Sequence, residues 1–223
     1  MSDIAGNATA VQMYRSLVGL GVVCSLAVAA VYLLTQPVIE RNRARALDAA
    51  ISRLFPEAQT RQAFVLMEEG VFRLTQNGGE GIYAVFDAGQ ALIGFALPAQ
   101  GMGYQDRIGV LYGYDPVRQA IVGLEVLESR ETPGLGDRIR HDADFHANFE
   151  HLDVRLRSDG AALDHALEVV RPGKRNQPWQ IDGITGATVS SVAIGDILNN
   201  SAGRWLPSIQ ARLEDFNDGA QTH

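Results

Sequence analysis

An uncharged apolar run from Ser16 to Leu34 dominates the first part of the chain. At about 1.5 Å per residue, a helix over this run would cross the roughly 30 Å hydrocarbon core of a bilayer. A cleaved signal peptide has a shorter apolar region that ends in small residues, whereas here the small residues Ala27-Val28-Ala29 lie inside the run. The pattern therefore predicts a retained transmembrane helix at residues 16–36, after a cytoplasmic N-terminus of residues 1–15.

The apolar positions after Pro37 first follow a helical period. Ala46, Ala50, Ile51 and Leu54 recur at the spacing of one helix face, and Pro56 follows them. This pattern predicts a helical stem at residues 37–56.

Short apolar runs that suit strands come next. They are Val71–Leu74, Ile82–Phe86, Leu92–Leu97, Ile108–Tyr114 and Ile121–Leu127. Asn77-Gly78-Gly79 and Asp87-Ala88-Gly89 separate the first three as tight turns. Helices are predicted at Asp142–Glu150 and after Thr188. We therefore expect an α+β fold in which residues 57–216 form one domain built on an antiparallel sheet with flanking helices, followed by a tail of residues 217–223.

Composition and motifs exclude several classes of function. The formal net charge is −7, and no basic stripe is present, which argues against a nucleic-acid partner. The single cysteine, Cys24, lies in the apolar run and has no partner for an internal disulfide. The sequence contains no Gly-x-Ser-x-Gly elbow, no His-Glu-x-x-His pair, no Walker A loop and no Gly-x-Gly-x-x-Gly fingerprint.

The stretch Asp182–Ser191 combines four hydroxyl side chains with two glycines just before an apolar run. The apolar spacing that follows predicts a helix that begins near Ser190 or Ser191, so Thr188 lies at or just before its N-terminus. Free N–H groups and the positive end of the helix dipole favour a phosphate at such a place. The alternative is an ordinary helix start with Ser or Thr at the N-cap.

A resemblance decides between these interpretations. Residues 182–188, Asp-Gly-Ile-Thr-Gly-Ala-Thr, match the motif Asp-x-x-Ser/Thr-Gly-Ala-Thr. This motif is typical of the FMN-binding family that includes the FMN-binding subunit of the Rnf electron transport complex and its counterpart in the sodium-pumping NADH:quinone reductase. The resemblance implies FMN bound covalently to Thr188 through a phosphoester, placed there by a flavin transferase. Further cofactor-binding candidates in this stretch are Asp182, Gly183, Thr185, Gly186, Ala187, Ser190 and Ser191.

Within this motif the residues receive different expected roles. Gly183 and Gly186 keep the loop open to the transferase. Asp182 is either read by the transferase or orients the Thr188 hydroxyl. Thr185, Ser190 and Ser191 are candidates for hydrogen bonds to the phosphate or ring, with helix capping as the alternative for these three.

A second loop, residues 131–137, has the sequence Glu-Thr-Pro-Gly-Leu-Gly-Asp and follows a predicted strand. Its proline and glycines predict a turn with exposed backbone N–H groups. The loop resembles the Glu-Thr-Pro-Gly-Leu-Gly loop that lies beside the flavin in the same family, which implies flavin contacts from Glu131, Thr132, Leu135 and Gly136. The preceding segment Gly101–Tyr104 also resembles the family, and Met102 or Tyr104 is a candidate to pack on the ring, with a plain turn as the alternative.

Three histidines could in principle bind a metal. His141, His146 and His151 are five residues apart, whereas metal pairs on a helix prefer spacings of three or four. We therefore predict a solvated helix and no metal site.

The orientation of the anchor is the point on which two arguments disagree. Arg41, Arg43 and Arg45 follow the apolar run and only Arg15 closely precedes it, so the positive-inside tendency would place the domain in the cytoplasm. In the resembled family the soluble domain is extracytoplasmic, and its stem is similar to residues 36–43 here. We follow the resemblance and expect a single-pass protein of the bacterial inner membrane with its domain on the periplasmic side.

The resemblance implies an electron-carrying subunit of an ion-translocating ferredoxin:NAD oxidoreductase, with no catalytic residue and no independent turnover of its own. Its expected partners are the other membrane subunits, the flavin transferase and the lipid bilayer. The alternatives are the matching subunit of the sodium-pumping reductase, a membrane-bound sensor that uses the same domain, and an assembly scaffold without flavin. Residues 147–178 match the family less well and are expected to form a surface insertion.

Overall fold

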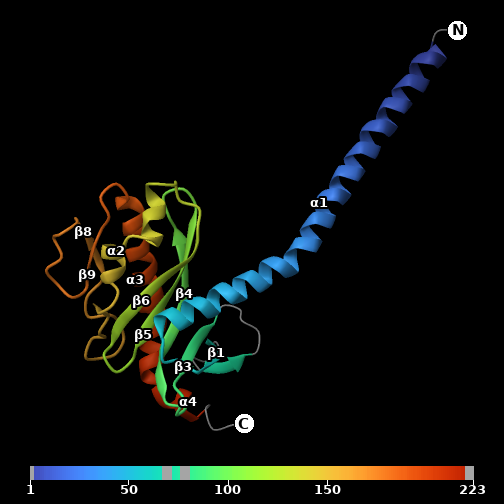
Figure 1. Ribbon diagram of the computed structural model, residues 1–223. Coiled ribbons are helices and arrows are strands. Elements are labelled where there is room, and N and C mark those ends of the chain that lie inside the picture. Colours follow the sequence, from blue (N-terminus) through green and yellow to red (C-terminus); the bar gives the residue numbers. More distant parts are fainter. Residues whose placement is uncertain (1–2, 67–71, 76–80, 219–223) are drawn as a thin grey trace. The chain divides into compact units, whose positions relative to one another are not determined.

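The computed structural model describes residues 3–66, 72–75 and 81–218 (Figure 1). The chain divides into two units, Met1–Ala46 and Leu47–His223.

The first unit is helical. Helix α1, Asp3–Leu54, starts in this unit and runs without a break past Pro37 into the stem residues. From Val11 to Leu34 its large apolar side chains are exposed. Within the part of the chain that the structure describes, this is the one helix long and apolar enough to cross a membrane. The described part of the protein does not bury these apolar side chains, which agrees with the predicted contact with lipid.

The second unit is built on a sheet of seven strands in the order β2-β1-β3-β4-β5-β6-β7, with every neighbouring pair antiparallel. The strands are β1 Thr60–Leu66, β2 Phe72–Thr75, β3 Ile82–Phe86, β4 Leu92–Met102, β5 Arg107–Asp115, β6 Ala120–Ser129 and β7 Leu152–Asp153. The predicted antiparallel sheet and the α+β fold class are confirmed.

The turn between β3 and β4 lies where the sequence predicted it. The Asp87 carboxylate accepts hydrogen bonds from the N–H groups of Gly89 (2.8 Å) and Ala91 (2.9 Å), which closes the predicted turn between β3 and β4. The predicted turn at residues 77–79 lies outside the described residues. Strand β1 was not predicted, because its first three residues, Thr60 to Gln62, are polar and interrupt the apolar run.

Side chains of β3 show that the sheet is covered on both faces. Ile82, Ala84 and Phe86 belong to the main core, whereas the alternate residues Tyr83 and Val85 belong to a second apolar cluster. All five are buried. A strand buried on both sides reads as a continuous apolar run, which is the pattern that the sequence shows.

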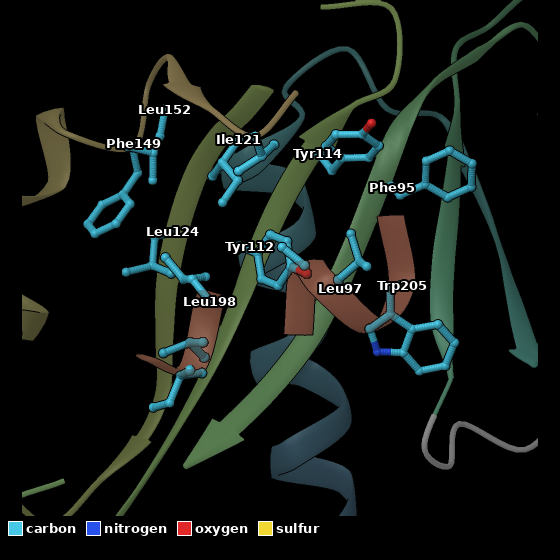
Figure 2. Close-up of a cluster of buried hydrophobic side chains, with 14 of the residues drawn as sticks. Phe95, Leu97, Tyr112, Tyr114, Ile121, Leu124, Phe149, Leu152, Leu198 and Trp205 are labelled. Carbon is cyan, nitrogen blue, oxygen red and sulfur yellow. The ribbon is translucent and has the colours of Figure 1, made fainter. Parts of the chain in front are cut away.

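Helix α3, Thr188–Ala211, covers one face of the sheet (Figure 1). Its buried residues pack against inward-facing side chains of β4, β5 and β6, and Figure 2 shows Leu198 and Trp205 among Leu97 and Tyr112 in this core. Burial of large apolar side chains contributes about 1.5–3 kcal/mol each to stability, so this layer holds the start of α3 in place on the sheet.

The last turns of α1 cover the other face. Three glycines on neighbouring strands leave the space that Leu54 and Phe55 occupy. A Cβ atom on Gly94 would lie 2.6 Å from the Phe55 ring, one on Gly113 would lie 3.1 Å from it, and one on Gly123 would lie 2.7 Å from Leu54. The stem therefore packs on the sheet from Leu47 onward. The apolar spacing predicted a helix at these residues but not this contact with the sheet.

Short elements complete the second unit. They are a 3-10 helix η1 at Gly136–Arg140, α2 at Ala143–Ala147, the parallel pair β8 Glu168–Val170 and β9 Gln180–Asp182, and α4 at Leu213–Asp218. Helix α2 is shorter than the predicted Asp142–Glu150. Asp142 is its N-cap, and the side-chain amide of Asn148 donates to the carbonyl of Phe145 (3.0 Å), which helps to end the helix there.

Burial raises the pKa of the Tyr112 and Tyr114 hydroxyls, although contacts with Ser201 and Gln210 partly oppose the shift. The folded state keeps these protons at pH values where the unfolded chain, with a tyrosine pKa of about 10, has lost them. Their contribution to stability is thus present below about pH 10 and is lost as pH rises.

Above about pH 10 we expect the free energy of unfolding of Tyr112→Phe to fall less steeply than that of wild type, by about 1.4 kcal/mol per pH unit. Thermal unfolding of the full chain in detergent, measured from pH 9 upward, tests it. If stability falls equally steeply with pH in wild type and variant, the prediction is contradicted.

Candidate functional site

The predicted attachment stretch forms a short connection between β9 and α3. Gly183 follows β9 directly, and its N–H donates to the Val170 carbonyl (2.9 Å), which keeps it close to β8. The next four residues, Ile184–Ala187, form a turn closed by the Ala187 N–H and the Ile184 carbonyl (3.0 Å). Gly186 has a φ of +85° in this turn, a value that side chains other than glycine adopt with strain.

Helix α3 begins at Thr188, two to three residues earlier than the apolar spacing predicted, and Thr188 is exposed. The prediction that Thr188 lies at the helix N-terminus is confirmed. The N-cap residue is Ala187, which has no side-chain capping bond. The Ser or Thr cap of the alternative interpretation is therefore not formed, and the first N–H groups of α3 have no partner within the helix.

The two serines of the first turn point into the protein. Ser191 is fully buried; its Oγ accepts from the Ile184 N–H (3.1 Å) and donates to the Ala187 carbonyl (2.9 Å). These bonds fix the turn to the helix. Ser190 is also buried, and its hydroxyl donates to Oε2 of Glu131 at 2.5 Å. Neither hydroxyl is exposed at the surface where Thr188 lies.

The Glu131 carboxylate connects the second predicted loop to the first. Its Oε2 accepts from Ser190, and its Oε1 accepts from the Gln105 N–H (3.0 Å) in the turn between β4 and β5. Only 5% of Glu131 is exposed. Among the described residues no lysine, arginine or histidine pairs with it, so two neutral donors satisfy a buried carboxylate.

Two glycines give this carboxylate its space. A Cβ atom on Gly136 would lie 2.4 Å from Oε2 of Glu131 and 2.6 Å from the Ser190 Oγ, and a Cβ atom on Gly103 would lie 2.4 Å from Oε1 of Glu131. Gly136 is buried by these contacts. Its requirement for glycine therefore follows from close packing within the protein.

Other residues of the second loop are more accessible. Leu135 is 54% exposed, as is Val189 on the first turn of α3. The Thr132 hydroxyl donates to the side-chain carbonyl of Gln105 (2.9 Å). The Oδ1 atom of Asp137 is buried and has no hydrogen-bond partner among the described residues. The site thus offers apolar side chains at the surface and one unused acceptor within the loop.

Arg138, in η1, is a member of the site that the sequence did not reveal. Its Nη1 donates to the Thr185 carbonyl (2.8 Å), and its Nη2 donates to Oδ2 of Asp142 (2.6 Å). It directly follows the Glu131–Asp137 loop in the sequence, but nothing local indicates that it reaches a residue so much later in the chain.

Asp182 has its side chain directed toward another segment. Its Oδ1 accepts from the N–H groups of Lys174 and Arg175, both at 3.0 Å. The Asn148 amide pairs with both backbone groups of Asp182: Oδ1 of Asn148 accepts from the Asp182 N–H (2.9 Å), and Nδ2 donates to its carbonyl (3.2 Å). In this structure Asp182 shapes the turn that precedes β9, and the buried Asn148 holds the end of β9.

The remaining candidates lie apart from this arrangement. Gly101 and Gly103 face α3 and Glu131, so strand alternation places the intervening Met102 on the opposite face of β4. Both ring nitrogens of His146 lie within hydrogen-bond distance of carbonyls, those of Leu124 (3.1 Å) and Ile139 (2.9 Å). Within the described ranges, no group of three or more His, Cys, Asp and Glu side chains is placed to hold a metal ion.

The turn Ile184–Ala187, called the attachment turn from here on, gives a prediction whose control lies in the helix that follows. Gly186→Ala is expected to destabilise the protein by about 1–2 kcal/mol, because alanine is strained at positive φ. Gly203 lies exposed within α3 with no atom near its missing Cβ, so Gly203→Ala should stabilise by roughly 0.5–1 kcal/mol. Thermal unfolding in detergent measures both. Shifts of the same sign would contradict the assigned turn.

Sequence comparison defines the class of domain. Residues 103–203 match the FMN-binding domain family. The match begins in the turn between β4 and β5 and ends within α3, so it includes both loops of the site. This part of the chain, with both loops, is therefore similar in sequence to FMN-binding domains.

The chain is similar to proteins named as the G subunit of the ion-translocating oxidoreductase complex. It is 29% identical to the one from Methanosarcina acetivorans over 122 residues, 53% of this chain and 55% of the relative. It is 26% identical to the one from Pseudoalteromonas atlantica over 192 residues, 81% of each chain. It is 36% identical to the one from Pasteurella multocida over 101 residues, 45% of each chain. For the first and third, the match spans about half of the relative's length.

Two crystal structures share the fold. Shewanella oneidensis NqrC superposes with a TM-score of 0.54 at 18% identity, over 76% of this chain and 87% of that one. The C subunit of the Na(+)-translocating NADH-quinone reductase from Parabacteroides distasonis gives a TM-score of 0.50 at 18% identity, over 74% and 79%. These structures confirm the fold, and the sequence matches to the G subunits and to the FMN-binding domain family confirm the resemblance inferred from the two motifs.

Proposed function

We propose that this chain is a membrane-anchored flavoprotein subunit that holds one FMN covalently on Thr188 and relays electrons within an ion-translocating electron transport complex. One observation carries the proposal. The fold brings the loop at residues 131–136 against the stretch Asp182–Ser191 through the Glu131–Ser190 bond, and it leaves Thr188 of that stretch exposed. A threonine hydroxyl at an uncapped helix N-terminus suits esterification by a phosphate.

The residues present fit the phosphate of FMN. The Thr188 hydroxyl makes no hydrogen bond with the described residues, and nothing lies within 4 Å of a Cβ atom built on Gly186. The N–H groups of the first turn of α3 are free of intrahelical partners and lie at the positive end of the helix dipole. An anionic phosphodiester can therefore be accommodated there without a cluster of lysines, which agrees with an acidic chain.

The residues also fit the flavin ring. Leu135 in the second loop and Val189 in the first turn of α3 present exposed apolar surface, and a ring would cover part of it. The Glu131 carboxylate accepts hydrogen bonds from the Ser190 hydroxyl and the Gln105 N–H and so holds the second loop against the first turn of α3. When bound, FMN would supply one-electron chemistry, and this chain's part would be to tether and orient it.

The wider assignment follows the relatives. Proteins named as part of an ion-translocating oxidoreductase complex match the chain by sequence, whereas the NqrC structures match it by fold. We therefore place the chain in a complex of the first kind, with other membrane subunits as partners and a flavin transferase as the maturation enzyme. The apolar helix would anchor it in the bacterial inner membrane, with the domain on the periplasmic side. A tether of this kind confines the flavin to a small volume around its redox partners.

The test is the intact mass of the full chain, purified in detergent after expression with and without a flavin transferase. One FMN adduct is expected only with the transferase, and tryptic mapping should locate it on the peptide Asn176–Arg204. A mass without adduct in both samples would contradict the covalent flavoprotein and favour the scaffold without flavin.

A further inference from the structure

Arg138 fastens the attachment turn to the second loop. Its backbone lies in η1, and its guanidinium donates to the Thr185 carbonyl (2.8 Å) and to the Asp142 carboxylate (2.6 Å). Asp142 is itself fixed, because its other oxygen accepts from the Phe145 N–H (3.1 Å) as the N-cap of α2. The Arg138 side chain that donates to the Thr185 carbonyl is thus also held by the Asp142 carboxylate.

The Thr185 carbonyl belongs to the central peptide of the turn. Ile184–Ala187 is closed by the Ala187 N–H, and Gly186 has a φ of +85° in its third position, so the turn is of type II. Type I and type II turns differ by a flip of the central peptide, and glycine at the third position accepts both. A donor on the Thr185 carbonyl favours the one orientation that the structure shows.

We propose that Arg138 is a positioning residue for flavin attachment. By holding the Thr185 carbonyl it keeps the turn in type II, and the turn places Thr188 at the start of α3 with its hydroxyl exposed. The proposal rests on the proposed function of Thr188 as the acceptor. A role as the counter-charge of the phosphate is less favoured, because Asp142 already neutralises the guanidinium.

Arg138→Gln tests the proposal, with Arg140→Gln as the matched control. Arg140 is in the same 3-10 helix and is exposed, and its side chain makes no hydrogen bond or ion pair with the described residues. The full chain in detergent is incubated with flavin transferase and flavin donor, and the initial rate of adduct formation is followed by mass. Arg138→Gln should be about tenfold slower than wild type, the scale of one lost charge-assisted hydrogen bond.

A second measurement separates positioning from general stability. Hydrogen exchange in the peptide that contains residues 183–190 should be faster in Arg138→Gln than in wild type, because the Ala187 amide loses protection when the turn loosens. Arg138→Lys keeps a cationic donor and should recover part of both effects. The control variant should match wild type in rate and exchange.

The outcomes are distinct. Slower attachment together with faster exchange confined to this peptide supports the proposal. An unchanged rate overturns it while leaving Thr188 as the acceptor, and so does a slower rate with unchanged exchange. If wild type takes up no flavin, the proposed function fails, and the assignment of Arg138 as a positioning residue for attachment fails with it.

Discussion

Thr188→Ala is expected to carry no covalent flavin under conditions in which wild type carries one FMN. The hydroxyl of Thr188 is the atom to which the phosphoester would be formed, and alanine removes it. Thr188 is exposed at the first position of α3, where alanine is well tolerated, so the free energy of unfolding should change by no more than about 0.5 kcal/mol. Intact mass and in-gel flavin fluorescence after denaturation measure the difference.

Ser158→Ala is the control. Ser158 is also exposed, lies outside both loops of the site, and its hydroxyl makes no hydrogen bond with the described residues. This variant should keep its FMN. A Thr188→Ala protein with the mass of flavinylated wild type would show that attachment occurs elsewhere.

Glu131→Ala is expected to have the largest effect on stability of the site variants. It removes the acceptor of one buried donor, the Ser190 hydroxyl, and of one part-buried donor, the Gln105 N–H, and leaves a small cavity. The unsatisfied buried hydroxyl costs about 1–3 kcal/mol and the part-buried N–H about 1 kcal/mol, so a loss of about 2–4 kcal/mol is expected. For a domain of this size that corresponds to a fall in Tm of roughly 4–16 °C. Flavin uptake should fall as well, because the first turn of α3 loses its contact with the second loop.

Glu150→Ala is the control for that measurement. Glu150 is exposed, and its side chain makes no hydrogen bond or ion pair with the residues that the structure describes. Ser190→Ala, alone and combined with Glu131→Ala, completes a double-mutant cycle in which a coupling of about 1–2 kcal/mol is expected. Near-UV circular dichroism of the full chain in detergent follows unfolding. A Tm within a degree of wild type for Glu131→Ala would show that the two loops do not depend on this carboxylate.

Local patterns in the sequence predicted a large part of the fold. The uncharged run Ser16–Leu34 predicted the anchor helix, and apolar runs predicted β2 to β6 to within a few residues at most ends. These signals are short-range, since strand and helix periods are visible within a few residues. The pairing of β1 between β2 and β3 was not predicted, because partners distant along the chain decide where a half-polar strand is placed.

Sequence patterns did not reveal how the residues of the two loops contact one another. Glu131, Gly136 and Ser190 are buried and in contact with one another, and their expected contact with a flavin stays a prediction. Arg138 and Asn148 were not predicted at all. Their partners, Thr185 and Asp182, lie more than thirty positions away, and no spacing rule connects such residues.

The long apolar helix, the fold class and the proposed acceptor threonine are thus properties of contiguous sequence. Each depends on neighbours along the chain: an apolar run long enough for a bilayer, alternating strands, and a turn with glycine before a helix. The construction of the site is a property of long-range packing. The Glu131–Ser190 bond, the Arg138–Thr185 bond and the space left by Gly103 and Gly136 exist only once β4, η1 and α3 lie against one another. Buried polar groups must find partners wherever the fold places them, and the fold places these far apart in sequence.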